Sequence, residues 1–150
     1  MKKRKVIVLG IGNSGRQDDG LGWLFIDYLN EESVKYDLDY RYQLQIEDAE
    51  LISKYDTVIF VDAVKEKTRK GFYFKNCEPS SKFSFSTHEL LPETILYLAE
   101  DLYQHKPKAF ILGIEGVEWN LKIGLSPKAK ENFEKAKEYF NHHQIWKEEV

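Results

Sequence analysis

The stretch Val6-Ile-Val-Leu-Gly-Ile-Gly-Asn-Ser-Gly-Arg-Gln-Asp-Asp-Gly-Leu-Gly22 decides the fold of this chain. Its first four residues form an apolar run that ends at a glycine, which is typical of a strand covered on both faces. A glycine-rich turn over residues 10–15 follows, and two adjacent carboxylates come after it. A helix is predicted next, because apolar residues recur at positions 21, 24, 25, 28 and 29, the spacing of one buried helix face. The chain therefore opens as strand, turn and helix, with two acids just before the helix.

The same alternation of strands and helices continues along the chain. We expect further strands at residues 40–46, 57–62, 71–76 and 109–114, and further helices at 48–53, 91–102 and 127–140. Only nine residues separate Asp62 from Phe72, too few for a parallel crossover, so the 71–76 strand is predicted to run antiparallel to the others. This order predicts one domain over residues 1–150 with an α/β fold. We expect a three-layer α/β/α sandwich, in which a mostly parallel five-stranded sheet with one antiparallel strand carries helices on both faces.

Local signals refine three of these elements. The 40–46 strand alternates polar and apolar residues and is placed near an edge of the sheet. The 91–102 helix has two candidate starts, the capping box Ser86-Thr-His-Glu89 and a proline at the first helical position, Pro92. Its apolar stripe is Leu91, Ile95, Leu98 and Leu102. The last helix should begin with Ser126 as N-cap and bury Ala129, Phe133, Ala136 and Phe140.

Composition excludes several classes of protein. The single cysteine, Cys77, excludes an internal disulfide and a cysteine-based zinc cluster. The 22 basic and 25 acidic residues are interspersed, which argues against nucleic acid as the main partner. No apolar run approaches the roughly 20 residues that span a bilayer, and the apolar run after the basic N-terminus is too short for a signal peptide. We therefore expect a cytoplasmic protein with no membrane or nucleic-acid partner.

Three candidate site positions follow predicted strands. Asp18 and Asp19 come after the first strand, Asp62 ends the third, and His88 precedes the helix that follows the fourth. In open α/β sheets, ligands bind beyond the carboxyl ends of the strands, so these side chains should converge. Carboxylates with an imidazole suit nickel, zinc or iron. Each residue also has a structural interpretation: Asp18 and Asp19 as caps whose oxygens accept backbone N–H groups, Asp62 as a turn cap, and His88 as part of a helix start.

Two other functions are disfavoured. Gly10-x-Gly12-x-x-Gly15 matches a dinucleotide fingerprint, but two carboxylates at the following helix start would repel a pyrophosphate, so we expect no nucleotide. A nucleophilic hydrolase is also disfavoured, because Cys77 stands beside Glu78, which would raise the pKa of the thiol. The Gly-x-Ser-x-Gly elbow of serine hydrolases is missing from the sequence.

With these residues assembled, the chain resembles the hydrogenase maturation endopeptidases, which trim the C-terminus of the large subunit of nickel–iron hydrogenases. The resemblance covers nearly the whole chain. It rests on Gly10-Ile-Gly-Asn13, Asp18-Asp-Gly-x-Gly22, Val61-Asp62-Ala63, Ser86-Thr-His88, Gly113-Ile-Glu-Gly and Gly124-Leu-Ser-Pro127. It implies that Asp19, Asp62 and His88 are the metal-contacting and catalytic residues.

The resemblance also implies an unusual mechanism. The family is thought to recognise nickel already bound in the large-subunit precursor and then to cut a C-terminal extension, so nickel is carried by the substrate. We expect Gly12, Asn13 and Arg16 to bind this substrate, with Arg16 meeting an acidic or C-terminal group or else only solvent. The turn that holds Arg16 and the loop that holds Trp119 depart from the family pattern. A non-catalytic metal- or peptide-binding module on the same fold is the alternative function, and the sequence leaves the oligomeric state open.

Overall fold

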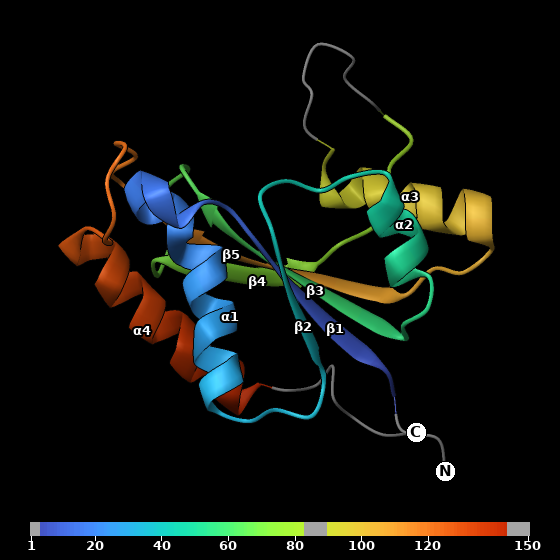
Figure 1. The fold of residues 1–150 in the computed structure, drawn as a ribbon, viewed down its shortest axis with the longest axis horizontal. Coiled ribbons are helices and arrows are strands. Elements are labelled where there is room, and N and C mark those ends of the chain that lie inside the picture. Colours follow the sequence, from blue (N-terminus) through green and yellow to red (C-terminus); the bar gives the residue numbers. More distant parts are fainter. Residues whose placement is uncertain (1–3, 83–89, 144–150) are drawn as a thin grey trace.

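A five-stranded sheet forms the centre of the molecule (Figure 1). The computed structural model describes residues 4–82 and 90–143. The strands lie in the order β2-β1-β3-β5-β4, and β4 alone runs antiparallel, against β5. Their bounds are β1 Val6–Ile11, β2 Asp37–Arg41, β3 Thr57–Val64, β4 Phe72–Asn76 and β5 Lys108–Glu115. The predicted α/β sheet with one antiparallel strand is confirmed.

Helices cover both faces of this sheet. The bounds are η1 Ser14–Gly20, α1 Leu21–Glu31, α2 Glu47–Ile52, α3 Pro92–Tyr103 and α4 Pro127–His142. Helices α1 and α4 lie on one face, and α2 and α3 lie on the other (Figure 1). Alternate residues of each central strand enter opposite cores: Val6 and Val8 pack with α1 and α4, whereas Ile7 and Leu9 pack with α2 and α3. Burial on both faces is the physical reason that these strands are unbroken apolar runs.

The second strand lies earlier in the chain than the sequence predicts. The 40–46 prediction is wrong, because β2 ends at Arg41 and residues 42–46 form a loop. The carbonyl of Arg41 accepts hydrogen bonds from Gly12 N at 2.8 Å and from Trp23 Nε1 at 2.9 Å. The buried Asp48 carboxylate then binds Arg41 Nε and Gln45 N, both at 2.9 Å, and holds the loop in place. The predicted edge position is confirmed, since β2 is the first strand of the sheet.

The two long C-terminal helices begin as their prolines indicate. Pro92 occupies the first turn of α3, while the alternative start at Ser86–Glu89 lies outside the described residues. The predicted stripe of α3 is partly wrong, because Leu91 and Leu102 are exposed. The buried face is made by Thr94, Ile95, Leu96 and Ala99. In α4, the side chain of Ser126 caps Ala129 N, as predicted. None of the helices in the described part of the chain is long and apolar enough to cross a membrane.

Candidate functional site

A pocket of about 320 Å³ lies beyond the carboxyl ends of β1 and β3. From β1 the chain crosses to β2 on one side and then returns to β3 on the other, so the strand order reverses between β1 and β3. Such a reversal opens a crevice in which α/β proteins bind ligands. Asp19 and Asp62 both line this pocket. The structure therefore brings together two of the three predicted metal-contacting residues.

Asp19 is positioned by a tight turn between β1 and η1. Gly12 has a φ of +146°, and a Cβ built on it would lie 2.0 Å from the carbonyl oxygen of Asp19. The same carbonyl accepts a hydrogen bond from Asn13 N at 3.0 Å. The Asn13 side chain caps η1 by accepting from Gly15 N at 2.8 Å. Of the predicted substrate-binding residues, Gly12 and Arg16 line the pocket, whereas Asn13 is not among its described lining residues.

The other glycines of this segment serve the packing of α1. A Cβ on Gly10 would lie 2.4 Å from the carbonyl oxygen of Gly22. A Cβ on Gly22 would in turn lie 2.4 Å from the carbonyl oxygen of Ile11 and 2.7 Å from that of Val61. These contacts let the first turn of α1 approach β1 and β3 closely. Close helix–strand packing accounts for Gly10 and Gly22 without a bound pyrophosphate.

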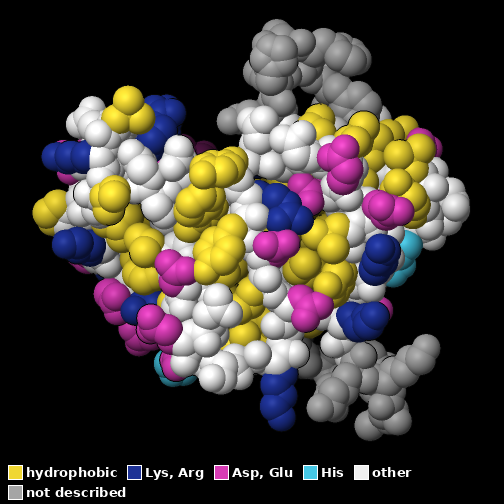
Figure 2. Space-filling model, viewed as in Figure 1, with side chains coloured by type: hydrophobic (Ala, Val, Ile, Leu, Met, Phe, Trp, Pro, Cys, Tyr) yellow, Lys and Arg dark blue, Asp and Glu magenta, His cyan; other side chains and the backbone are white. Residues whose placement is uncertain are grey.

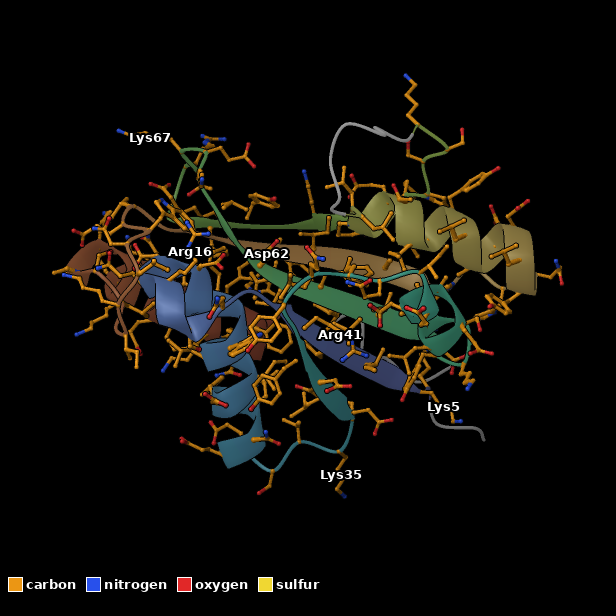
Figure 3. All side chains as sticks on the ribbon, turned by 45° about the horizontal axis from the view of Figure 1, so that its top comes forward. Lys5, Arg16, Lys35, Arg41, Asp62 and Lys67 are labelled. Carbon is orange, nitrogen blue, oxygen red and sulfur yellow. The ribbon has the colours of Figure 1, made fainter. Side chains whose placement is uncertain are left out.

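Asp62 marks the point at which β3 leaves the core. Residues 57–61 are buried, and Asp62 is the first half-buried residue of the strand. Its Oδ1 accepts a hydrogen bond from Ala63 N at 2.9 Å, a local contact of the kind expected for a turn cap. Figure 3 shows Asp62 and Arg16 near the same end of the sheet, on segments that are far apart in the sequence.

His88 lies outside the described residues, so its approach to the two aspartates stays a prediction. Within residues 4–82 and 90–143, histidine, cysteine, aspartate and glutamate form no group of three or more that could hold a metal ion. Two carboxylates are an incomplete ligand set for a borderline divalent metal. A third ligand at this pocket would come from His88 or from a bound partner.

Asp18 has a structural role that differs from that of its neighbour. It is fully buried, and its carboxylate accepts hydrogen bonds from Val117 N (2.7 Å), Glu118 N (2.9 Å), Ser126 N (2.8 Å) and Ser126 Oγ (2.7 Å). Burial alone would raise the pKa of Asp18, but the hydrogen bonds from Ser126, Val117 and Glu118 outweigh it and lower the pKa. The predicted capping chemistry is present, but the donors belong to residues 116–126 and not to the first turn of α1.

Residues 116–126, which we call the Trp119 loop, are also held by Gln17. The backbone N–H of Gln17 donates to the carbonyl of Lys122 at 2.9 Å, and Gln17 Oε1 accepts from Asn120 N at 3.0 Å. No local sequence pattern indicates this link, because the bonded residues lie about a hundred positions apart. Trp119 and Lys65, which were not predicted as site residues, also line the pocket, with Lys65 Nζ 5.3 Å from the centre of the indole ring.

A second hollow of about 490 Å³ adjoins the first and shares Asp62, Leu91 and Pro92 with it. Cys77 lines this hollow, and its Sγ lies 3.7 Å from Glu93 Oε1. Burial, with the nearby Glu93 carboxylate, raises the pKa of the Cys77 thiol to about 12. A thiol that stays protonated near neutral pH is a poor nucleophile, as the sequence predicts for this cysteine.

No protein-family profile and no curated protein sequence matches the chain. Among solved structures, the NiFe hydrogenase maturation protease HycI from Thermococcus kodakarensis KOD1 superposes with a TM-score of 0.70 at 24% identity, over 93% of this chain and 92% of that one. The chain has the fold of the hydrogenase maturation proteases.

Two further maturation proteases share this fold. The hydrogenase 2 maturation peptidase from Thaumarchaeota archaeon SCGC_AB-539-E09 gives a TM-score of 0.65 at 21% identity, covering 93% of this chain and 97% of that one. The hydrogenase maturating endopeptidase HybD from E. coli gives 0.63 at 21% identity, covering 89% and 88%. The maturation-protease fold extends over nearly the whole chain, and the predicted resemblance is confirmed at the level of fold.

Proposed function

We propose that this chain is an endopeptidase that removes a C-terminal extension from the large-subunit precursor of a nickel–iron hydrogenase, after detecting nickel bound in that precursor. Asp19, Asp62 and His88 would contact the nickel, which arrives as part of the substrate. The observation that carries this proposal is the position of Asp19 and Asp62, which come from distant segments and line one pocket where the strand order reverses. The reaction is proposed to take place in the cytoplasm.

The chemistry of the pocket supports metal-dependent recognition. Two carboxylates and one imidazole leave coordination positions open, so a metal held by substrate thiolates can bind them without leaving the substrate. A metal held between the substrate and these residues would orient the substrate chain and would polarise a carbonyl or a water near the scissile bond. A cysteine-nucleophile mechanism fits poorly, because Cys77 lies in the adjoining hollow with a strongly raised pKa.

The fold supports the proposal as well. The three solved structures compared above share it at 21–24% sequence identity and carry the names hydrogenase maturation protease, maturation peptidase and maturating endopeptidase.

A trimming assay tests the proposal. The substrate is a purified, nickel-loaded large-subunit precursor of a nickel–iron hydrogenase, and trimming is followed by intact-mass spectrometry. Asp19→Asn, Asp62→Asn and His88→Ala should each lower the trimming rate at least about 100-fold, because each removes a contact to the metal. Asp101→Asn, an exposed aspartate on α3, is the matched control and should trim at the wild-type rate. If all three variants trim the precursor at the wild-type rate, the assignment of these residues to the site is refuted.

The same assay separates the two candidate functions. Trimming of nickel-free precursor at the nickel-loaded rate would refute detection of the metal. Tight binding of nickel-loaded precursor without any trimming would favour the non-catalytic module. In that case Asp62→Asn should still weaken binding, because the same pocket would hold the metal.

A further inference from the structure

One wall of the pocket is cationic. Arg16, Lys65 and Trp119, which we call the cationic wall, line the pocket together with Asp19 and Asp62. The side chains of Arg16 and Lys65 are exposed, and Trp119 is half-buried. In the part of the chain that the structure describes, neither Arg16 nor Lys65 forms an ion pair with a carboxylate. Both cations are therefore available to an anion that enters the pocket.

Arg16 is held at this wall by an unusual backbone. The next residue, Gln17, has φ 48° and ψ −115°, a conformation that costs free energy in any residue except glycine. Two hydrogen bonds offset this cost, since Gln17 is buried with its N–H and its Oε1 bound to the Trp119 loop. Because the turn directs Gln17 into the protein, its neighbour Arg16 is left on the exposed side, at the pocket (Figure 3).

Trp119 and Lys65 are also held in place. The backbone on both sides of Trp119 is fixed, by Asp18 at Val117 and Glu118 and by Gln17 at Asn120. The indole packs on Gly116, where an added Cβ would lie 3.0 Å from the ring. Lys65 Nζ lies 5.3 Å from the ring centre, within the range of a cation–π contact. This contact restrains the lysine and keeps its charge at the pocket.

We propose that the cationic wall is a carboxylate subsite, which binds an acidic side chain or the free C-terminal carboxylate of a bound peptide. The inference rests on the proposed function in one respect, that the ligand of the pocket is a peptide. The planar guanidinium of Arg16 matches a carboxylate with two parallel hydrogen bonds, and the Lys65 ammonium adds a point charge. Asp19 and Asp62 place two negative charges in the same pocket lining. A metal on the substrate would offset these charges, and the wall would then attract an anion.

Peptide titrations followed by NMR of the tryptophan indole N–H groups test the subsite in the full chain. The first probe, acetyl-Ala-Gly-Glu-Gly-Ala-amide, carries only a side-chain carboxylate. The second, acetyl-Ala-Gly-Gln-Gly-Ala with a free C-terminus, carries only an α-carboxylate, and its C-terminal amide is the neutral control. The Trp119 signal is assigned with Trp119→Phe. Each titration is repeated with the double variant Asp19→Asn/Asp62→Asn. Its pocket lacks the two negative charges that a bound divalent metal would offset.

At least one of the carboxylate probes should shift the Trp119 signal, and the double aspartate variant should bind it more tightly than wild type. The neutral control should cause no saturable shift. Arg16→Gln and Lys65→Gln should each weaken binding by about threefold to fivefold, in keeping with a solvent-exposed ion pair. Lys67→Gln and Arg69→Gln, neighbouring cations outside the lining of this pocket, are the matched controls and should leave binding unchanged. Whichever carboxylate probe binds identifies the source of the anion.

Two results of the titrations would overturn the subsite: equal binding of the neutral peptide, or no shift of the Trp119 signal by either carboxylate probe at 10 mM in both the wild type and the double aspartate variant. A precursor trimmed at the wild-type rate by Arg16→Gln/Lys65→Gln would also overturn it while leaving the proposed protease activity standing. Peptide binding at Trp119 by a protein that trims no precursor would have the opposite meaning: it would support the subsite and refute the proposed activity.

Discussion

Replacement of the buried Asp18 carboxylate by an amide, Asp18→Asn, should destabilise the protein and loosen one wall of the pocket. Asp18 Oδ2 accepts three hydrogen bonds, from Val117 N, Glu118 N and Ser126 Oγ, and Oδ1 accepts one from Ser126 N. An asparagine oxygen placed at Oδ2 keeps three of these bonds in weaker, uncharged form. Its amide group then faces Ser126 N–H, so that two donors meet in a buried site.

The magnitude follows from these contacts. A hydrogen bond to a charged group contributes about 1.5–3 kcal/mol, and a neutral one about 0.5–1.5 kcal/mol. One lost bond and three weakened bonds, with some relaxation of the loop, should lower the free energy of unfolding by about 3 kcal/mol. For a chain of this length, that corresponds to a fall in Tm of about 6–12 °C. Asp101→Asn, on the exposed surface of α3, is the control and should change stability by less than about 0.5 kcal/mol.

Urea unfolding followed by circular dichroism at several pH values measures both the magnitude and its origin. Hydrogen bonds lower the pKa of Asp18 in the folded state below its ordinary value of 3.8. The ionised carboxylate therefore stabilises the fold fully above that ordinary value, and its contribution is lost as the pH falls through the lower, folded-state pKa. The difference in the free energy of unfolding between wild type and Asp18→Asn should be constant from pH 7 to pH 5 and should become smaller below about pH 3.8. A difference below 0.5 kcal/mol at pH 7, or one that does not narrow in acid, would refute this account.

Three other substitutions test separate parts of the structure. Cys77→Ala should change precursor trimming by less than about twofold, because a thiol whose pKa is raised to about 12 is not an effective nucleophile; a loss of trimming with intact folding would contradict this. Gly12→Ala should slow trimming by roughly 100-fold, because the added Cβ would collide with the Asp19 carbonyl. Gly124→Ala is the control: Gly124 also has a positive φ, but nothing lies within 4 Å of an added Cβ, so this substitution should affect stability alone. Phe140→Ala, which removes a ring that α4 buries in the core, should lower the free energy of unfolding by about 3–5 kcal/mol in urea, and a loss below 1 kcal/mol would show that the core repacks.

The central sheet could be predicted from the sequence because its signals are local. The strands β1, β3 and β5 are apolar runs buried on both faces, and the short connection before β4 forces that strand to run antiparallel. The edge strand β2 could not be placed correctly, because its ends are set by distant partners. Charged residues, Asp37 and Asp39, flank its one aliphatic residue, Leu38, and the loop after Arg41 is fixed by the buried Asp48.

The location of the candidate site was predictable for a topological reason. Parallel strands end at the same edge of a sheet, so acids near the carboxyl ends of β1 and β3 lie near one another wherever the sheet forms. The cationic wall was not predictable in the same way. Its indole comes from a loop that is held by Asp18 and Gln17, about a hundred residues away in the sequence, and no local pattern reports such a contact.

The adjacent residues Asp18 and Asp19 have different roles because their side chains point in different directions. In a 3₁₀ helix successive side chains point about 120° apart. Asp18 therefore faces the Trp119 loop when Asp19 faces the pocket. The acid that anchors the wall and the acid proposed to contact the metal are consecutive residues of one short segment. A shift of this segment would therefore move the anchor of the Trp119 loop and the proposed metal contact together. Stability and the proposed function are thereby coupled at Asp18, whereas at Asp19 the proposed function can be lost without unfolding.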